Sequence, residues 1–274
     1  MFEGKIWWVT GASSGIGAAF SAALSKAGAK LILSGRNAQA LTEAAARCVT
    51  PTLVLPFEAT DFAALPQIVD QAWSWAAQQG GGVEGLVNNA GISQRSLAVD
   101  TVFEVYQRIV DVDLMAPIAL TQLVLPRMVA QGSGQIVAIS SVAGIVGSPL
   151  RSAYSAAKHG LIGYHDSVRA ETAHLGLKVL VVAPGSVKTN VSRNALDSNA
   201  KARGFSDAAI DGGMEADDAA AAIMAALVAG QRELILAQGG ELMAAQLRRS
   251  NPDALFDLTA QLAANDYAKL FGVK

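Results

Sequence analysis

The sequence has little cysteine, little charge and few histidines, and each shortage excludes a kind of site or partner. Cys48 is the only cysteine among 274 residues, so an intramolecular disulfide and a cysteine-based zinc site are both excluded. The three histidines share no metal-ligand spacing, and we expect no metal site. Charged residues make up 16% of the chain and its net charge is −2, which argues against binding to nucleic acid or anionic lipid.

The chain also lacks a long uninterrupted apolar run, although 51% of its residues are apolar. The best candidates are broken by Asp113, Pro117 and Pro126, or by Lys30 and Arg36. None reaches the roughly 20 residues that a membrane-spanning helix needs. The first residues enter a predicted strand at once and do not resemble a signal peptide. We therefore expect a cytoplasmic protein without a membrane anchor.

What the sequence does contain is a regular alternation of short apolar runs and longer helical segments. Such runs are typical of parallel strands that are covered on both faces, and the alternation predicts right-handed crossovers. No linker divides the chain, so we predict a single α/β domain over residues 1–274 with a doubly wound, parallel, seven-stranded sheet. The predicted strands are 5–10, 30–35, 52–57, 84–89, 134–140, 177–183 and 232–237, and the predicted helices include 15–28, 37–48, 61–79, 101–131 and 152–176.

Two regions depart from this alternation. Residues 186–214 are polar and contain several glycines, and an irregular stretch of this length is usually a lid or binding loop. Residues 239–274 have helical spacing and predict a C-terminal helical extension. The extension could cover a groove or pack against a partner subunit, and the sequence does not distinguish these.

The first predicted strand runs directly into the glycine-rich stretch TGASSGIG, residues 10–17. Gly11 permits a tight exit from the strand, while Gly15 and Gly17 remove side chains where a phosphate and a neighbouring strand approach the backbone. The helix that follows offers free N–H groups and a positive dipole end. This strand–turn–helix pattern favours a dinucleotide site.

Five motifs in a fixed order resemble the short-chain dehydrogenase/reductase family: TGASSGIG (10–17), NNAG (88–91), ISSVAG (139–144), YSAAK (154–158) and PGSVKT (184–189). The resemblance covers about residues 4–237 and implies a Rossmann fold, a nicotinamide cofactor, a small-molecule substrate and a homodimer or homotetramer. The pattern is most similar to the branch of hydroxysteroid dehydrogenases and retinal and ketone reductases, without their N-terminal anchor.

The end of the second strand bears on the choice of cofactor. Family members that use NAD carry an acidic residue there, whereas this chain has Gly35 followed by Arg36. A guanidinium can bind a 2′-phosphate through paired hydrogen bonds, and no carboxylate stands at position 35 to repel it, so we expect NADP(H). The resemblance implies these cofactor-binding residues: Gly11, Ser13, Ser14, Gly15, Ile16, Gly17, Arg36, Glu58, Ala59, Asn89, Ala90, Gly91, Tyr154, Lys158, Pro184, Gly185, Val187 and Thr189.

Tyr154 and Lys158 are one helical turn apart, and this spacing suits proton transfer. A free phenol with a pKa near 10 is a poor base at neutral pH, but a neighbouring lysine stabilises its phenolate. In the resembling family the tyrosine exchanges a proton with the substrate oxygen, and the lysine also binds the nicotinamide ribose. Ser141, thirteen residues before Tyr154, has the family position that orients the substrate oxygen at the end of the fifth strand.

The fourth catalytic position of the family is an asparagine whose backbone carbonyl holds a relay water, and here it is Asp113. Aspartate can keep the bent helix, with Pro117 assisting the bend, but it also introduces a negative charge. A tolerated structural variant and a residue that tunes the site are both open at this point.

The resemblance implies interconversion of a ketone or aldehyde with its alcohol. Val142, Ala143, Pro149 and Leu150 are expected around the pocket mouth, which favours an apolar or aromatic substrate. The runner-up function is a 3-oxoacyl-type reductase, against which the long C-terminal extension argues. The alternatives from other classes are a non-catalytic NADPH-binding sensor or scaffold and a lyase or epimerase, and the presence of both Tyr154 and Lys158 argues against them.

Overall fold

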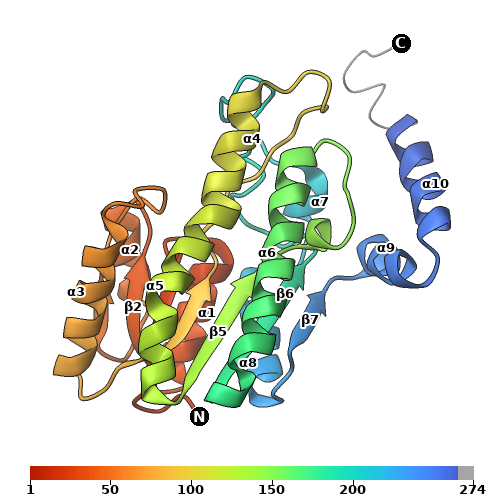
Figure 1. Ribbon diagram of the computed structural model, residues 1–274. Helices are drawn as coiled ribbons and strands as arrows, with labels where there is room; N and C mark the ends of the chain where they lie inside the picture. Colours follow the sequence, from red (N-terminus) through yellow and green to blue (C-terminus); the bar gives the residue numbers. More distant parts are fainter. Residues whose placement is uncertain (265–274) are drawn as a thin grey trace.

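The predicted parallel sheet is present. The computed structural model describes residues 1–264, and its seven strands form one sheet in the order β3-β2-β1-β4-β5-β6-β7 (Figure 1). All six strand pairs are parallel. The strands are β1 (Ile6–Thr10), β2 (Lys30–Ser34), β3 (Thr52–Val54), β4 (Val83–Asn88), β5 (Gly134–Ile139), β6 (Leu177–Pro184) and β7 (Glu233–Leu236).

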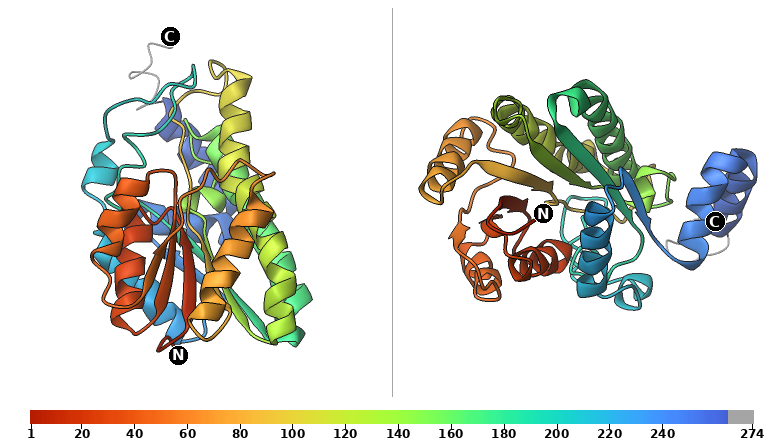
Figure 2. Two further views of the ribbon diagram at one scale, coloured as in Figure 1. Left: turned by 90° about the vertical axis from the view of Figure 1, so that its left-hand side faces the viewer. Right: turned by 90° about the horizontal axis from the view of Figure 1, so that it is seen from below.

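Helices cover both faces of the sheet, as the views in Figure 2 show. One layer contains α1 (Gly15–Lys26), α2 (Ala38–Ala45) and α8 (Ala216–Val228). The other contains α3 (Leu65–Gln78), α5 (Ala116–Gln131) and α6 (Ser152–Thr172). The remaining helical elements are α4 (Phe103–Val110), η1 (Asp111–Met115), η2 (Val142–Gly144), η3 (Ala173–Leu175), α7 (Ala208–Asp211), α9 (Gly239–Ser250) and α10 (Pro252–Leu262).

The central strand β1 shows why the strand sequences are apolar throughout. Trp7 and Val9 pack with Phe20 of α1 in one apolar cluster. Ile6 and Trp8 point to the opposite face, into the cluster formed with α3 and α5. Because successive side chains alternate between two covered faces, the four positions from Ile6 to Val9 are all apolar. The last residue, Thr10, is polar and buried, and its hydroxyl donates to the Val87 carbonyl.

Two predicted elements differ in extent. The third strand ends at Val54 instead of residue 57 because Pro56 has no N–H, although the Leu55 and Phe57 N–H groups still donate to carbonyls of the β2 segment. The predicted helix 101–131 is interrupted by the π-helical turn η1, which contains Asp113. The bend expected beside Pro117 is therefore a π-turn immediately before it.

The helical run 103–131 is long and apolar enough to cross a membrane by length and composition alone, which corrects the expectation that no segment is. Leu120, Val124 and Met128 on its inner side are buried against the sheet. Its π-turn carries the buried charge of Asp113. These contacts cover the inner side of the run, and 33% of its most apolar window is buried in the protein.

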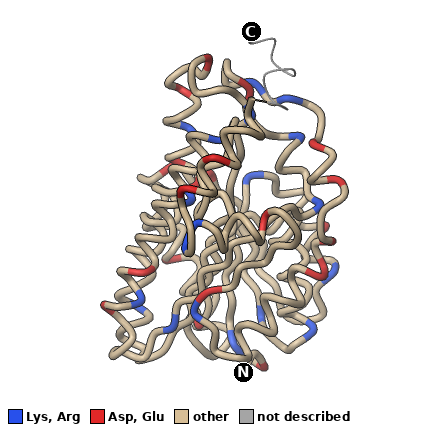
Figure 3. Tube along the Cα trace, turned by 90° about the vertical axis from the view of Figure 1, so that its right-hand side faces the viewer, with Lys and Arg blue, Asp and Glu red and all other residues tan. Residues whose placement is uncertain are grey.

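The segment 186–214 lies between β6 and α8 and, apart from α7, is irregular, as predicted. It is tied to the chain after β4, because the Leu196 N–H donates to the Ser93 carbonyl and the Arg95 N–H donates to the Leu196 carbonyl. The predicted C-terminal extension is helical through α10, and its residues 265–274 lie outside the described part. Figure 3 shows acidic and basic residues interspersed, without a face of one sign in that view.

Candidate active site

A cavity of about 820 Å³ opens at the carboxyl edge of the sheet. Residues that follow β1, β4, β5 and β6 line it, together with residues of the segment 186–214. Strand order reverses here, since β2 and β4 lie on opposite sides of β1. In doubly wound sheets the ligand crevice forms at this reversal, where connections leave on opposite sides.

The glycine-rich turn brings the backbone to the cavity wall. Gly11 has a φ of +63° and Gly15 a φ of +54°, a region that side chains disfavour. A Cβ on Gly11 would lie 2.8 Å from the Ala90 Cα atom, and one on Gly15 would lie 2.8 Å from the Thr189 Cγ2 atom. Any larger residue at either place would therefore displace the neighbouring cavity wall.

The start of α1 fits a diphosphate. Ser14 is the residue before the helix, and its side chain makes no capping hydrogen bond, so the first N–H groups stay available. With the close glycine backbone and the size of the cavity, these groups fit a dinucleotide. Gly17, predicted to bind cofactor, does not line the cavity, because its Cα faces the Gly11 carbonyl, 2.4 Å from where a Cβ would lie. It permits turn packing instead.

Every other predicted cofactor or catalytic residue lines the cavity. Arg36 and Glu58, which are far from Tyr154 in the sequence, lie next to each other in the cavity wall. The Arg36 Nη1 atom is 3.9 Å from the Glu58 Oε2 atom. A carboxylate therefore does stand beside Arg36, although not at position 35. Both side chains are largely exposed, so this contact is weak and leaves the guanidinium open to a stronger anion.

Tyr154 and Lys158 project from α6 into the cavity. The Lys158 Nζ atom lies 5.7 Å from the centre of the Tyr154 ring and donates a hydrogen bond of 3.1 Å to the Ile139 carbonyl. Lys158 is almost fully buried. Burial alone would lower the pKa of Lys158, but the charges of Asp113 and Tyr154 outweigh it and raise this pKa.

Ser141 lies two residues beyond the end of β5, not at its last residue as predicted. It precedes η2, and its Oγ atom accepts a hydrogen bond of 3.1 Å from the Ala143 N–H. The same hydroxyl donates to the Pro184 carbonyl over 3.3 Å. This pairing fixes the hydroxyl at the cavity wall between two strand ends.

Asp113 is fully buried and faces Lys158. Its Oδ2 atom lies 3.3 Å from Lys158 Nζ, and its Oδ1 atom accepts a hydrogen bond of 2.8 Å from the Ile92 N–H. Burial raises the pKa of Asp113, more than the Lys158 ammonium and the Ile92 N–H lower it. The Asp113 side chain thus contacts Lys158 directly, which favours the tuning alternative over a neutral structural variant.

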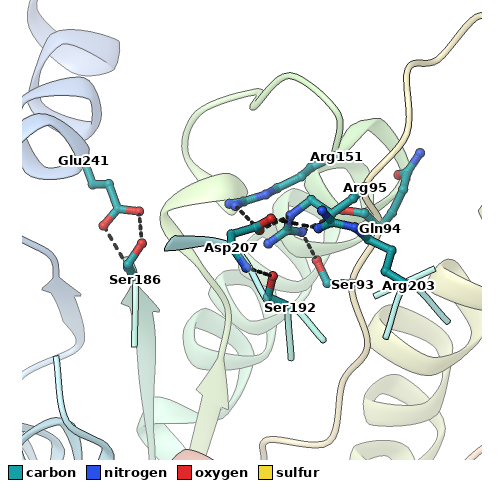
Figure 4. Close-up of polar contacts among 9 residues, drawn as sticks. All are labelled: Ser93, Gln94, Arg95, Arg151, Ser186, Ser192, Arg203, Asp207 and Glu241. Carbon is teal, nitrogen blue, oxygen red and sulfur yellow. Dashed lines mark hydrogen bonds and ion pairs between the residues drawn. The ribbon is translucent and has the colours of Figure 1, made fainter. Parts of the chain in front are cut away.

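The C-terminal extension reaches the site through one carboxylate. Glu241 of α9 accepts hydrogen bonds from the Ser186 N–H (2.7 Å) and the Ser186 hydroxyl (2.9 Å), a pair of contacts visible in Figure 4. A Cβ on Gly185 would lie 2.1 Å from the same carboxylate. Because Gly185 and Val187 line the cavity, α9 holds the backbone of this wall.

The residues expected around the pocket mouth are not there. Val142, Ala143, Pro149 and Leu150 do not line the cavity, and Val142 is buried against Ala245 of α9. The extension covers Val142, which sequence reasoning had left uncovered.

Sequence reasoning also missed several polar and charged residues that line the cavity: Ser93, Arg95, Arg108, Asp111, Arg151 and Asn190. We call this part of the cavity wall the substrate side. Arg95 follows the NNAG motif by four residues and Arg151 precedes Tyr154 by three. Their proximity to these motifs was the only available signal.

Comparisons with known proteins agree with this geometry. Residues 5–200 match the family described as short chain dehydrogenase. Dehydrogenase/reductase SDR family member 7B of Bos taurus is 36% identical over 263 residues, covering 94% of this chain and 81% of the relative, and human member 7 is 38% identical over 69% of this chain and 57% of the relative.

Solved structures agree as well. A short-chain dehydrogenase from Streptomyces avermitilis superposes with a TM-score of 0.76 at 28% identity, over 97% of this chain and 98% of that one. One from Sphingobium yanoikuyae, in complex with NADPH, gives a TM-score of 0.75 at 25% identity, over 95% and 96%. The chain belongs to the short-chain dehydrogenase/reductase family.

Proposed function

We propose that the protein is an NADP(H)-dependent oxidoreductase that interconverts a ketone or aldehyde and the corresponding alcohol. The observation that carries this proposal is the shared cavity. Ser141, Tyr154 and Lys158 line the same space as the uncapped start of α1 and Arg36. The hydride-transfer chemistry of the family therefore has its binding groups and its proton donor in one place.

The cofactor-binding roles follow from the chemistry of the wall. The N–H groups at the start of α1 suit the diphosphate, and the Arg36 guanidinium suits a 2′-phosphate. Lys158, beside Tyr154, suits the nicotinamide ribose. The Sphingobium yanoikuyae relative, solved with NADPH, supports this choice of cofactor.

When bound, NADPH supplies the hydride that adds to the carbonyl carbon. The Ser141 hydroxyl would turn its one proton from the Pro184 carbonyl to the carbonyl oxygen of the substrate, and so orient that oxygen. Tyr154 would give its phenolic proton to that oxygen. The C=O double bond then becomes a C–O single bond, new C–H and O–H bonds form, and Tyr154 is left as a phenolate. Lys158 holds a positive charge near the phenolate that remains, and this charge lowers the cost of the transfer.

Pro117 adds support for a proton relay at Asp113. Pro117 lies four residues after Asp113. In an α-helix the N–H of that residue would donate to the Asp113 carbonyl, but proline has no N–H to donate. That carbonyl is the group that holds the relay water in the family. We propose the same role here.

The test is absorbance of the reduced nicotinamide, followed with NADPH and NADH in parallel against a panel of ketones and aldehydes. We expect turnover, with NADPH preferred. Tyr154→Phe should bind NADPH with native affinity and lose about 10²–10⁴ in turnover, because the ring still packs but no proton donor remains. NADPH binding without turnover of any carbonyl would favour the sensor or scaffold instead.

Assembly as a homodimer or homotetramer and a cytoplasmic location stay predictions. Light scattering and cell fractionation measure them.

A further inference from the structure

Three arginines converge on one aspartate at the substrate side of the cavity (Figure 4). Arg95 Nε lies 2.6 Å from Asp207 Oδ2, and Arg203 NH1 lies 2.8 Å from Asp207 Oδ1. Arg151 NH2 lies 4.0 Å from Asp207 Oδ2. Each oxygen of the Asp207 carboxylate is thus already paired with one guanidinium group, and Arg151 supplies a third guanidinium group nearby.

Arg95 and Arg151 line the same cavity as Ser141 and Tyr154, whereas Arg203 and Asp207 stand behind them. Arg95 is only 6% exposed. Its NH1 atom donates to the Ser93 hydroxyl and the Gln94 carbonyl, both over 2.7 Å. It is therefore a built part of the wall and not a mobile surface side chain.

The cluster carries more positive than negative charge. Burial, and then the charge of Arg151, lower the pKa of Arg95 to about 10 in spite of Asp207. One carboxylate cannot neutralise three guanidinium groups, and a buried excess of charge is costly without a counter-ion.

Arg151 is held in place although the described residues give its guanidinium no hydrogen bond. Leu150, just before it, has a φ of +64°, which L-residues rarely adopt. The Leu150 carbonyl accepts a hydrogen bond from the Ser96 N–H, and the Gln94 side chain accepts one from the Ala153 N–H. These contacts turn the chain so that Arg151 enters the cavity wall.

A purely structural role explains part of the cluster. Within the segment 186–214, Asp207 donates its N–H to the Ser192 hydroxyl and pairs with Arg203. Its pair with Arg95 then ties this segment to the body of the protein. This tie does not need Arg151. Residue 151 is therefore the part of the cluster that a ligand would use.

We propose that the substrate carries an anionic group, a carboxylate or a phosphate, that binds to Arg151 and the buried face of Arg95 beside Tyr154. This inference rests on the proposed function, and it names the class of substrate. Guanidinium groups bind such oxyanions through paired, charge-assisted hydrogen bonds. The substrate is then an oxo acid or a phosphorylated ketone, in place of the apolar or aromatic compound that the sequence favoured.

The kinetic test compares matched carbonyls with saturating NADPH: 4-oxopentanoate with its methyl ester, and dihydroxyacetone phosphate with dihydroxyacetone. Whichever anionic compound is the better substrate shows whether the site prefers a carboxylate or a phosphate. We expect the kcat/KM of that compound to exceed the kcat/KM of its neutral partner by about tenfold or more. Arg151→Gln should lower kcat/KM for the anion about 10- to 100-fold, mainly through KM, and leave the neutral compound nearly unchanged. Arg193→Gln removes a charge from an exposed position of the same segment and should change neither.

A binding measurement keeps the inference independent of turnover. Calorimetry with phenylacetate, phenylacetamide and phenyl phosphate needs no reducible carbonyl. We expect at least one anion to bind more tightly than the amide, and to lose that advantage in Arg151→Gln but not in Arg193→Gln. If the anions bind this way but no carbonyl is reduced, the proposed function fails and the anion site stands. If neutral and anionic compounds behave alike, or Arg151→Gln affects both equally, the anion site is refuted.

Discussion

Lys158 Nζ lies 3.3 Å from Asp113 Oδ2, and both side chains are almost fully buried. The resemblance to the family implies an asparagine at this position, whereas the residue here is Asp113, so the proposed general acid Tyr154 shares its lysine with a carboxylate. This ion pair offsets part of the positive charge that would otherwise stabilise a phenolate.

Asp113→Asn should move the basic limb of the pH profile for alcohol oxidation to lower pH. The amide can still accept from the Ile92 N–H, while the charge that opposes Lys158 is removed. Turnover at neutral pH should change by less than about tenfold, well short of the loss of an acid–base group. Oxidation rates with saturating alcohol and cofactor measure both effects. If the basic limb of this variant moved to higher pH instead, Lys158 would have lost its proton once the Asp113 carboxylate was removed, and the prediction would be wrong.

Asp113→Leu provides the control for this pair. It removes the counter-ion and the acceptor for Ile92 together, leaving a buried, unpaired ammonium. We expect a loss of about 3–5 kcal/mol in the free energy of unfolding. Denaturant titration measures it, and a loss as small as that of an exposed substitution would show that the pair is not ionised.

Arg36→Ala should weaken NADPH binding about 10- to 100-fold and leave NADH binding nearly unchanged, because only NADPH carries the 2′-phosphate. Fluorescence titration of both cofactors measures this. Glu58→Gln is the matched variant: with its carboxylate 3.9 Å from Arg36 removed, the affinity for NADPH should rise. Equal affinity of the native protein for the two cofactors would refute the assignment of NADP(H).

Glu241→Ala should weaken NADPH binding, by about tenfold, although Glu241 does not line the cavity. It leaves the Ser186 N–H and hydroxyl without their acceptor, so the wall that contains Gly185 and Val187 loses its support from α9. Gln246→Ala changes an exposed side chain of the same helix and should have no effect. If both variants bind NADPH alike, α9 does not support the cofactor wall.

The native state should lose stability as the pH falls from about 6.5 to 4 because of His165. This side chain is fully buried, its Nδ1 atom pairs with the Leu161 carbonyl over 2.9 Å, and burial lowers its pKa to about 4. The unfolded chain takes up a proton near pH 6.5 while the folded protein does not, so stability is complete above 6.5 and falls below it. The expected total loss is roughly 3 kcal/mol.

Urea unfolding at a series of pH values tests this. His165→Gln should flatten the dependence in that window, whereas His174→Gln, at an exposed position, should leave it unchanged. An equally steep dependence in both variants would assign the effect to other groups.

The fold could be predicted from local sequence because its determinants are local. A strand such as β1 is apolar from Ile6 to Val9 whichever neighbour covers it, and Gly11 and Gly15 are needed by the turn itself. The order of the motifs therefore sufficed for the sheet, the family and nearly all the cofactor wall. The sequence prediction was wrong about where two strands end: β5 ends two residues before Ser141, and β3 ends at Val54.

The substrate side was decided only by the tertiary structure. Arg95, Arg151 and Asp207 come from three distant segments, and no local pattern states that they meet. Electrostatic interaction depends on separation in space and on burial, both of which exist only after folding. The sequence determined that Asp113 carries a carboxylate; only the π-turn and the approach of α6 decided that it faces Lys158 and not solvent.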